Sequence, residues 1–120
     1  ESELMACLSG LVLRSTHVIA PWKGDFHPDH EACGRAAERV VCDVGATLTA
    51  YLFWTWHFGT TGLLEDLPLV RFPLSPDLLM VKMAALRCHQ SQLAWETEEP
   101  ILPKSLLLPA RRPFEIFLKS

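Results

Sequence analysis

The fold class is decided by residues 30–45, which read HEACGRAAERVVCDVG. The small and apolar positions in this stretch recur at intervals of three and four residues, and they are Ala32, Cys33, Ala36, Ala37, Val40, Val41 and Val44. At 3.6 residues per turn they form one stripe along a helix, while the charged residues fall outside it. Gly45 suits a left-handed C-terminal cap, and Asp29 is a candidate N-cap. The pattern predicts an amphipathic helix that covers a core.

Short apolar segments lie on both sides of this helix. Residues 17–20, stopped by Pro21, predict a buried strand, and residues 47–53 alternate as a strand covered on both faces would. The other predicted elements are helices at 3–13, 75–93 and 104–108 and strands at 69–74 and 114–118. This alternation predicts an α/β fold, Rossmann-like, with a mostly parallel sheet and flanking helices. No linker divides the chain, so we expect one domain over residues 1–120.

Composition narrows the class of protein. The net charge is −3, and no basic cluster provides the electrostatic footprint that nucleic acid requires. No apolar run is long enough to span a bilayer, and no basic region precedes the apolar segment 4–13 as in a signal peptide. The four cysteines are scattered without a C-x-x-C pair, which is typical of reduced thiols. We therefore expect a cytoplasmic protein with neither a nucleic-acid nor a membrane partner.

The candidate functional residues lie in and next to the loop that connects the predicted strand at 17–20 to the predicted helix. Ligands in α/β sheets bind at the carboxyl ends of strands, and this loop delivers His27-Pro28-Asp29-His30 there. Two imidazoles three residues apart can serve one metal, or one metal and a substrate beside it, and a nearby carboxylate can orient a ring. The alternative is that these residues are surface caps of the helix, because clustered titratable groups point to function only statistically.

Four segments resemble one protein family. Residues 24–37, GDFHPDHEACGRAA, are similar to the G-D-x-H-P-D-H-x-x-x-G-R-A-A block of LmbE/PIG-L deacetylases. Residues 54–57 (WTWH) resemble the family's W-x-W-H, residues 82–93 (KMAALRCHQSQL) its K-x-x-A-L-x-x-H-x-S-Q-L, and residues 112–117 (RPFEIF) its R-P-F-E-x-F. The order is the same, and the segments span nearly the whole chain. The chain thus resembles the C-terminal part of a bacterial zinc-dependent N-acetylglucosaminyl-type deacetylase.

The resemblance implies a hydrolase that removes an N-acyl, typically acetyl, group from an amino sugar or a related glycan-like small molecule by zinc-activated water. It implies that His30 is a zinc ligand, that His27 protonates the leaving amine or steadies the oxyanion, and that Asp29 tunes His27. Trp56 and His57 are expected to bind substrate. The alternative for the tryptophan segment is a hydrophobic plug, with at least Trp54 packed in the core.

The chain also differs from the family in one motif that the activity requires. The family's A-H-P-D-D-E motif, which supplies two of three protein ligands and the base, does not occur in these residues. We therefore expect a fragment of the three-layer sandwich, with weak zinc binding and no activity by itself. An open edge beside the strand ending at Ala20 would favour a homo-oligomer. The alternative function is a non-catalytic α/β module for interaction or regulation.

Overall fold

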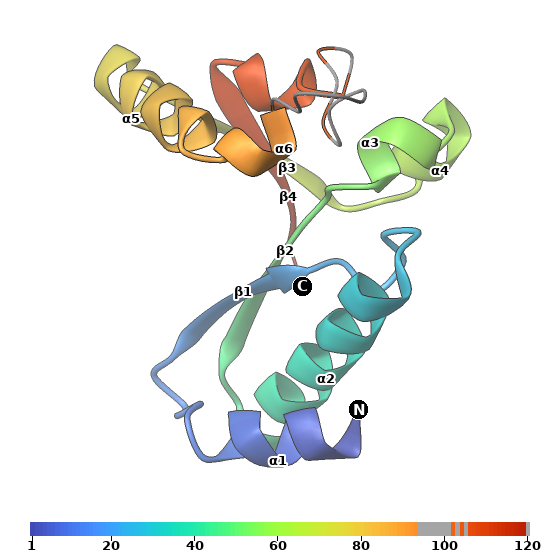
Figure 1. Cartoon of the computed structure of the whole chain (residues 1–120). Helices are drawn as coiled ribbons and strands as arrows, with labels where there is room; N and C mark the ends of the chain where they lie inside the picture. Colours follow the sequence, from blue (N-terminus) through green and yellow to red (C-terminus); the bar gives the residue numbers. More distant parts are fainter. Residues whose placement is uncertain (94–101, 103, 105, 120) are drawn as a thin grey trace. The chain divides into compact units, whose positions relative to one another are not determined.

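The computed structural model describes residues 1–93, 102, 104 and 106–119 (Figure 1). The chain divides into two compact units, one of Glu1–Val70 together with the C-terminal strand from Ile116, the other of Arg71–Glu115. The elements of the first unit are α1 (Ser2–Ser9), β1 (His17–Pro21), α2 (Pro28–Val44), β2 (Thr47–Tyr51), α3 (Thr55–Phe58) and α4 (Thr61–Glu65). Strands β3 (Leu69–Pro73) and β4 (Phe114–Lys119) lead into and out of the second unit, which contains α5 (Pro76–Arg87), α6 (Gln90–Leu93) and a 3₁₀ turn (Pro109–Arg111). None of the helices in the described residues is long and apolar enough to cross a membrane.

The strands form an open mixed sheet in the order β1-β2-β4-β3. Strands β1 and β2 are parallel, with His17 opposite Thr47, whereas β4 runs antiparallel to β2, with Leu118 opposite Ala50. The predicted α/β class is therefore confirmed, but the expectation of a mostly parallel sheet is wrong. The apolar pattern of residues 114–118 predicts a strand without its direction, because a period of two residues is the same in both directions.

The main core lies between α2 and the first two strands. Helix α2 turns its predicted stripe toward β1 and β2, and the buried cluster is Val12, Ala20, Ala37, Val40, Val41 and Leu48. Gly45 closes the helix in the predicted left-handed conformation, with φ of 70°. The N-cap is His27 rather than Asp29, because the helix starts two residues before the predicted first residue, His30. Proline at the first position suits this earlier start.

Gly34 brings α2 close to the end of β1. A Cβ atom at this position would lie 2.6 Å from the Pro21 carbonyl oxygen and 2.7 Å from the Lys23 backbone nitrogen. These are backbone atoms and cannot swing aside. The glycine therefore sets how near the helix runs to the loop that carries the histidines.

The Arg71–Glu115 unit is built around α5. The Ser75 hydroxyl caps this helix by accepting from the Leu78 N–H at 3.3 Å, as Ser-Pro-Asp predicts. The helix ends at Arg87 instead of continuing to residue 93, because a turn intervenes before α6. Lys82 Nζ forms an ion pair with Glu115 Oε1 at 2.6 Å. In place of the predicted helix over 104–108, the described residues of that stretch form turns, and residue 105 lies outside the described set.

Candidate functional site

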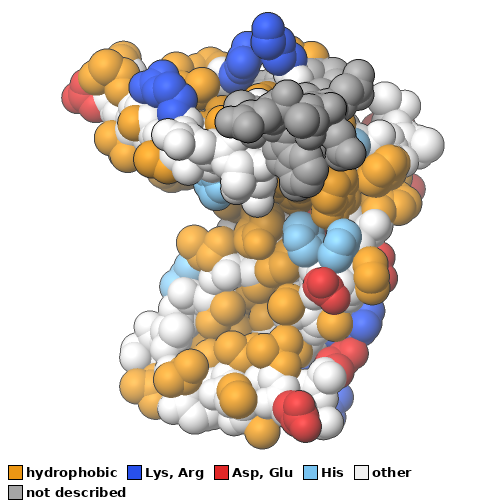
Figure 2. Space-filling model, viewed as in Figure 1, with side chains coloured by type: hydrophobic (Ala, Val, Ile, Leu, Met, Phe, Trp, Pro, Cys, Tyr) orange, Lys and Arg blue, Asp and Glu red, His pale blue; other side chains and the backbone are white. Residues whose placement is uncertain are grey.

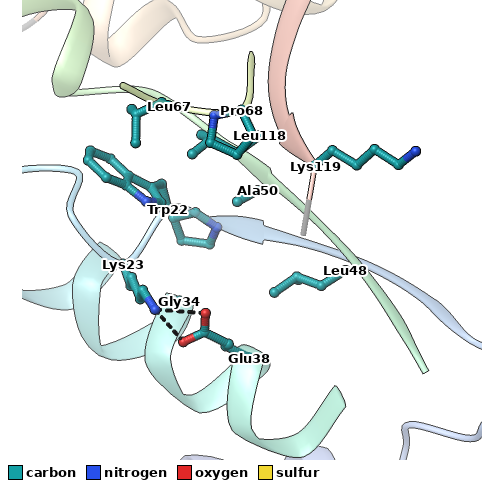
Figure 3. Close-up of a pocket in the computed structure, with 11 residues that line it drawn as sticks. Trp22, Lys23, Gly34, Glu38, Leu48, Ala50, Leu67, Pro68, Leu118 and Lys119 are labelled. Carbon is teal, nitrogen blue, oxygen red and sulfur yellow. Dashed lines mark hydrogen bonds and ion pairs between the residues drawn. The ribbon is translucent and has the colours of Figure 1, made fainter. Parts of the chain in front are cut away.

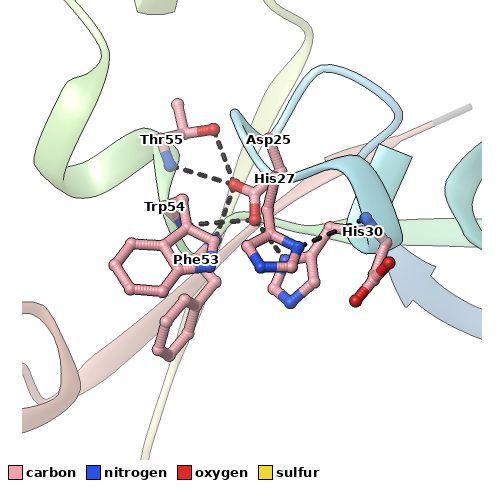
Figure 4. Close-up of polar contacts among 7 residues, drawn as sticks. Asp25, His27, His30, Phe53, Trp54 and Thr55 are labelled. Carbon is pink, nitrogen blue, oxygen red and sulfur yellow. Dashed lines mark hydrogen bonds and ion pairs between the residues drawn. The ribbon is translucent and has the colours of Figure 1, made fainter. Parts of the chain in front are cut away.

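Two loops meet at the carboxyl ends of β1 and β2. Because these strands are parallel, the loop after β1 and the segment after β2 leave the same edge of the sheet. Asp25, from the first loop, turns inward and is fully buried, with 0% of its surface exposed. Figure 4 shows its carboxylate directed at residues 53–55 and at the ring of His30. Asp25 therefore ties together the two loops that form the site.

The carboxylate of Asp25 accepts five hydrogen bonds. Oδ1 accepts from the backbone N–H of Phe53 at 2.8 Å, and from the N–H and hydroxyl of Thr55 at 3.0 and 2.7 Å. Oδ2 accepts from the Trp54 N–H at 3.1 Å and from His30 Nδ1 at 2.6 Å. Burial acts to raise the pKa of Asp25, but the bonds from Thr55, His30 and Phe53 outweigh burial and leave the pKa below its ordinary value. Asp25 is therefore an ionised, buried anchor.

Asp25 was missed by the interpretation from sequence, which treated it as a loop residue. Spacing alone does not indicate that residue 25 reaches residues 53–55, since that contact depends on the parallel pairing of β1 and β2. The signal that could have found it is the G-D-x-H-P-D-H pattern, in which the first Asp is a fixed position. Asp25 lies two residues before His27, and this spacing allows the Asp25 side chain to point into the protein while the His27 ring caps α2.

His30 has its proton position set by Asp25. An ionised carboxylate only accepts, so Nδ1 of His30 must donate at the 2.6 Å contact. Nε2 of the neutral ring then carries a lone pair, which is the nitrogen that can bind a metal or accept a proton. The ring lies edge-on to Tyr51 and Phe53, with centroids 6.5 and 5.9 Å away. His30 is therefore an oriented imidazole with one open acceptor nitrogen.

His27 has the opposite arrangement. As the N-cap of α2, its Nδ1 accepts from the Asp29 backbone N–H at 3.2 Å. In the neutral ring the proton is then on Nε2, which becomes a donor. The rings of His27 and His30 lie side by side, with centroids 5.0 Å apart. Together they offer one acceptor and one donor nitrogen, and the contact of Asp29 with His27 is made by the Asp29 backbone.

Phe26 connects the inward Asp25 to the capping His27. It is the only non-glycine residue with positive φ in the described part of the chain, with φ of 59°, and its side chain is 48% exposed. For an L-residue the left-handed conformation costs roughly 1–2 kcal/mol. The loop holds this strained residue between the two groups that define the site, and strain of this kind tends to concentrate at functional positions.

Aromatic rings form one wall of the site. Trp54 stacks with His27 at 6.1 Å and with Phe58 at 5.7 Å, and His57 lies edge-on to Trp54 at 6.0 Å. Burial lowers the pKa of His57, although the Asp25 charge opposes this effect, so the ring is neutral near pH 7. His57 reaches the histidine pair through Trp54, which contacts His57 on one side and His27 on another.

The two tryptophans are placed differently from the expectation. Trp54, expected in the core as the alternative interpretation, is half-buried and stacks on His27, whereas Trp56 packs against the buried cluster Ala50, Leu52 and Leu118. The physical reason is that residues 54–58 form a helical turn, on which positions two apart point to nearly opposite sides. Trp54, rather than Trp56, is the tryptophan in contact with the histidine pair.

The described residues do not by themselves fit a catalytic zinc ion. No group of three or more His, Cys, Asp or Glu side chains suited to a metal occurs among them. The Asp25 oxygens are engaged by five donors, which leaves His30 Nε2 as the oriented ligand atom. Catalytic zinc sites generally use three protein ligands and a water.

A cavity of about 240 Å³ lies elsewhere in the first unit (Figure 3). Its walls are mostly apolar and come from the end of β1 and the loop after it, from α2, β2 and β4, and from the segment before β3; they include Trp22, Leu48, Leu67 and Leu118. At its rim Lys23 Nζ bonds both carboxylate oxygens of Glu38 at 2.7 and 2.8 Å. Neither His27 nor His30 lines it. The cavity therefore contributes no group to the histidine site.

Comparison of the chain with protein-family models, with curated protein sequences and with solved structures gave no match. The likeness to LmbE/PIG-L deacetylases therefore rests on the four sequence segments.

Proposed function

We propose that this chain provides the histidine half of an N-deacetylase active site. The reaction is hydrolysis of the N-acyl, typically acetyl, amide of an amino sugar or a related small molecule, with zinc as the cofactor. The observation that carries the proposal is the opposite protonation of two adjacent rings, with His30 Nε2 an acceptor and His27 Nε2 a donor. Amide hydrolysis by a metal-bound water needs both kinds of group.

His30 acts as a metal ligand in this proposal. Asp25 accepts its Nδ1–H, which fixes the ring orientation and leaves Nε2 as the nitrogen available to a metal. The remaining ligands and the general base come from a segment with an A-H-P-D-D-E motif, supplied by the same polypeptide or by a second chain. Zinc bound in such a completed site would supply an activated water and would polarise the amide carbonyl.

His27 acts on the other side of the amide. In the neutral ring, its Nε2–H is a hydrogen-bond donor for the carbonyl oxygen of the amide. Negative charge develops on this oxygen during the reaction, so the hydrogen bond is stronger in the transition state than in the ground state. A neutral imidazole donates this hydrogen bond but does not release its N–H proton, so protonation of the leaving amine would require the imidazolium form of His27. Trp54 and His57 form the wall that excludes water and orients the substrate ring.

The proposal also includes the complete fold to which this chain would belong. We place the chain as an incomplete LmbE-like three-layer sandwich whose sheet continues beyond β1. The support is that β1 has β2 as its only neighbour among the strands of the described part. An additional strand beside β1 would end next to the loop that contains His27 and His30, which is where the missing ligands are needed.

The first test measures the protonation of the two rings in the chain as it is. Long-range ¹H–¹⁵N correlation spectra at pH 7.5 should report the Nδ1–H tautomer for His30 and the Nε2–H tautomer for His27. Asp25→Asn should shift His30 toward the other tautomer and leave His27 unchanged, and the signals of His17, at the other end of β1, should be the same in both proteins. Equal tautomer mixtures at both rings would remove the basis of the proposal.

The second test measures activity. The chain alone should bind zinc weakly in calorimetry and release no acetate from N-acetylglucosamine. In a longer protein that includes the residues encoded upstream of Glu1, His30→Ala should abolish zinc binding, whereas His27→Ala should retain zinc and lower kcat by roughly 10²–10⁴-fold. His17→Ala is the matched control and should change neither. Tight stoichiometric zinc binding by the chain alone, unaffected by His30→Ala, would contradict the assignment.

The alternative of a non-catalytic interaction module is favoured by one observation, the single oriented ligand atom among the described residues. The two functions differ in what precedes Glu1 in the gene. An encoded A-H-P-D-D-E motif within one domain length supports the enzyme, whereas a start codon with no such motif nearby supports the module.

A further inference from the structure

One side of α5 is apolar and open to solvent. Leu78, Met80 and Val81 are 50%, 65% and 66% exposed, and Ala84 and Ala85 are exposed as well. At about 100° per residue, these five positions occupy one continuous side of the helix, which we call the α5 face. In Figure 2 hydrophobic side chains gather over this helix at the upper left.

The opposite side of α5 is partly buried. Leu79, Met83 and Leu86 are partly buried, and the Lys82 side chain, 20% exposed, makes its ion pair with Glu115. A surface helix usually turns charged residues outward and apolar residues inward. On α5 the central lysine is held inward and five apolar residues point outward, and exposed apolar patches of this kind mark interaction surfaces.

The charges at the two ends of the helix indicate what covers this face. Asp77 is in the first turn and Arg87 in the last, both are exposed, and neither has an ion-pair partner among the described residues. If a second α5 packs antiparallel about a two-fold axis at the level of Lys82, Asp77 of each copy lies level with Arg87 of the other. The symmetry makes this pairing twice.

The apolar residues match in the same arrangement. With a rise of about 1.5 Å per residue, Leu78 of one copy lies level with Leu86 of the other and one residue from Ala85, and Met80 lies level with Ala84. The large residue of one copy thus meets a small one of the other, which allows the helices to approach closely. Antiparallel helix dipoles also oppose one another favourably.

We propose that the α5 face is a self-association surface that pairs antiparallel with α5 of a second copy of this chain. The proposal rests on residues 77–87 alone and is independent of the histidine site.

Sedimentation velocity of the full chain over a wide concentration range tests this pairing. The wild type should form a dimer, and Val81→Glu should be monomeric because it buries two unpaired carboxylates at the centre. Asp77→Arg and Arg87→Asp should each raise the dimer Kd by about tenfold or more, as expected for two rim pairs made repulsive. The double variant should restore the Kd to near the wild-type value.

Controls separate this result from other causes. Leu11→Glu, which also places a carboxylate at an exposed leucine, should leave the dimer unchanged. Circular dichroism should report equal helix content for the charge variants, and the rescue by the double variant excludes simple loss of the helix. A monomer at every concentration overturns the proposal, as does a dimer that survives Val81→Glu and is lost in Ile19→Glu at the β1 edge. A dimer that Val81→Glu dissociates but that shows no charge rescue overturns the antiparallel arrangement.

Discussion

Helices α2 and α5 begin in the same way and end in different environments. Each starts with a capping side chain, then Pro, then Asp, and each has its cap hydrogen bond to a backbone N–H. Yet α2 buries five of its residues, whereas α5 buries none. Start signals thus define where a helix begins, but they do not determine what it packs against. That depends on whether its apolar stripe meets a sheet, as it does for α2.

The caps themselves also differ. Ser75 caps α5 through a hydroxyl that has no other role in the described structure. His27 caps α2 through a ring nitrogen, and this use of Nδ1 leaves Nε2 as the donor nitrogen of the neutral ring. In α2 the start of the helix and the candidate chemistry are therefore joined in one side chain. Four changes should sharpen this contrast.

The largest effect is expected at Asp25. Asp25→Ala leaves the N–H groups of residues 53–55 and the Thr55 hydroxyl without their acceptor, and we expect it to lower the free energy of unfolding by roughly 3–5 kcal/mol. Urea denaturation measures this loss. Asp29→Ala is the matched control, because this nearby aspartate lies in the first turn of α2 and its side chain has no hydrogen bond in the described part; it should cost less than about 1 kcal/mol.

The same carboxylate predicts a pH dependence. The folded pKa of Asp25 is below its ordinary value of 3.8, so its stabilisation is complete above that pH and is lost as the pH falls through the folded value. The urea midpoint of the wild type should therefore fall steeply below about pH 4. Asp25→Asn should lack this part of the acid dependence. Parallel profiles for the two proteins between pH 2 and 5 would contradict an ionised anchor.

A smaller effect is expected at Gly34. Gly34→Ala forces backbone atoms of residues 21–23 away from α2 and should cost about 3 kcal/mol. Gly62→Ala in α4 is the control, because a Cβ there meets no atom within 4 Å, and it should change stability by less than about 1 kcal/mol. Equal effects of the two substitutions would show that the close approach of α2 to β1 is not a constraint.

Two valines test the contrast between the helices directly. Val40 in α2 is 1% exposed and Val81 in α5 is 66% exposed. Val40→Ala should cost about 2 kcal/mol from lost burial and a small cavity, whereas Val81→Ala should cost less than about 0.5 kcal/mol of monomer stability. Denaturation at low protein concentration measures both without a contribution from association. A large loss at Val81 would show that α5 packs more tightly than its exposure indicates.

The sequence predicted local features well and tertiary contacts less well. The stripe from Ala32 to Val44 and the cap at Gly45 depend on helical period and on φ, which are local properties, and both agree with the structure. The direction of β4 and the inward turn of Asp25 depend on how distant segments meet, which apolar periodicity does not encode. The exchange of Trp54 and Trp56 follows from one helical turn that alternation did not predict.

The smallest effect is expected at Phe26, and a pair of substitutions isolates it. Both Phe26→Gly and Phe26→Ala remove the ring, but only glycine adopts the φ of 59° without steric cost. The glycine variant should therefore be about 1 kcal/mol more stable than the alanine variant, despite its greater freedom when unfolded. Urea denaturation of the two variants gives this difference directly.

Because the loop joins Asp25 to His27, strain held there by the five hydrogen bonds of Asp25 should relax in Asp25→Asn. The advantage of glycine over alanine should then shrink in that background, and an unchanged difference would mean that the φ of Phe26 is set by the cap at His27 instead.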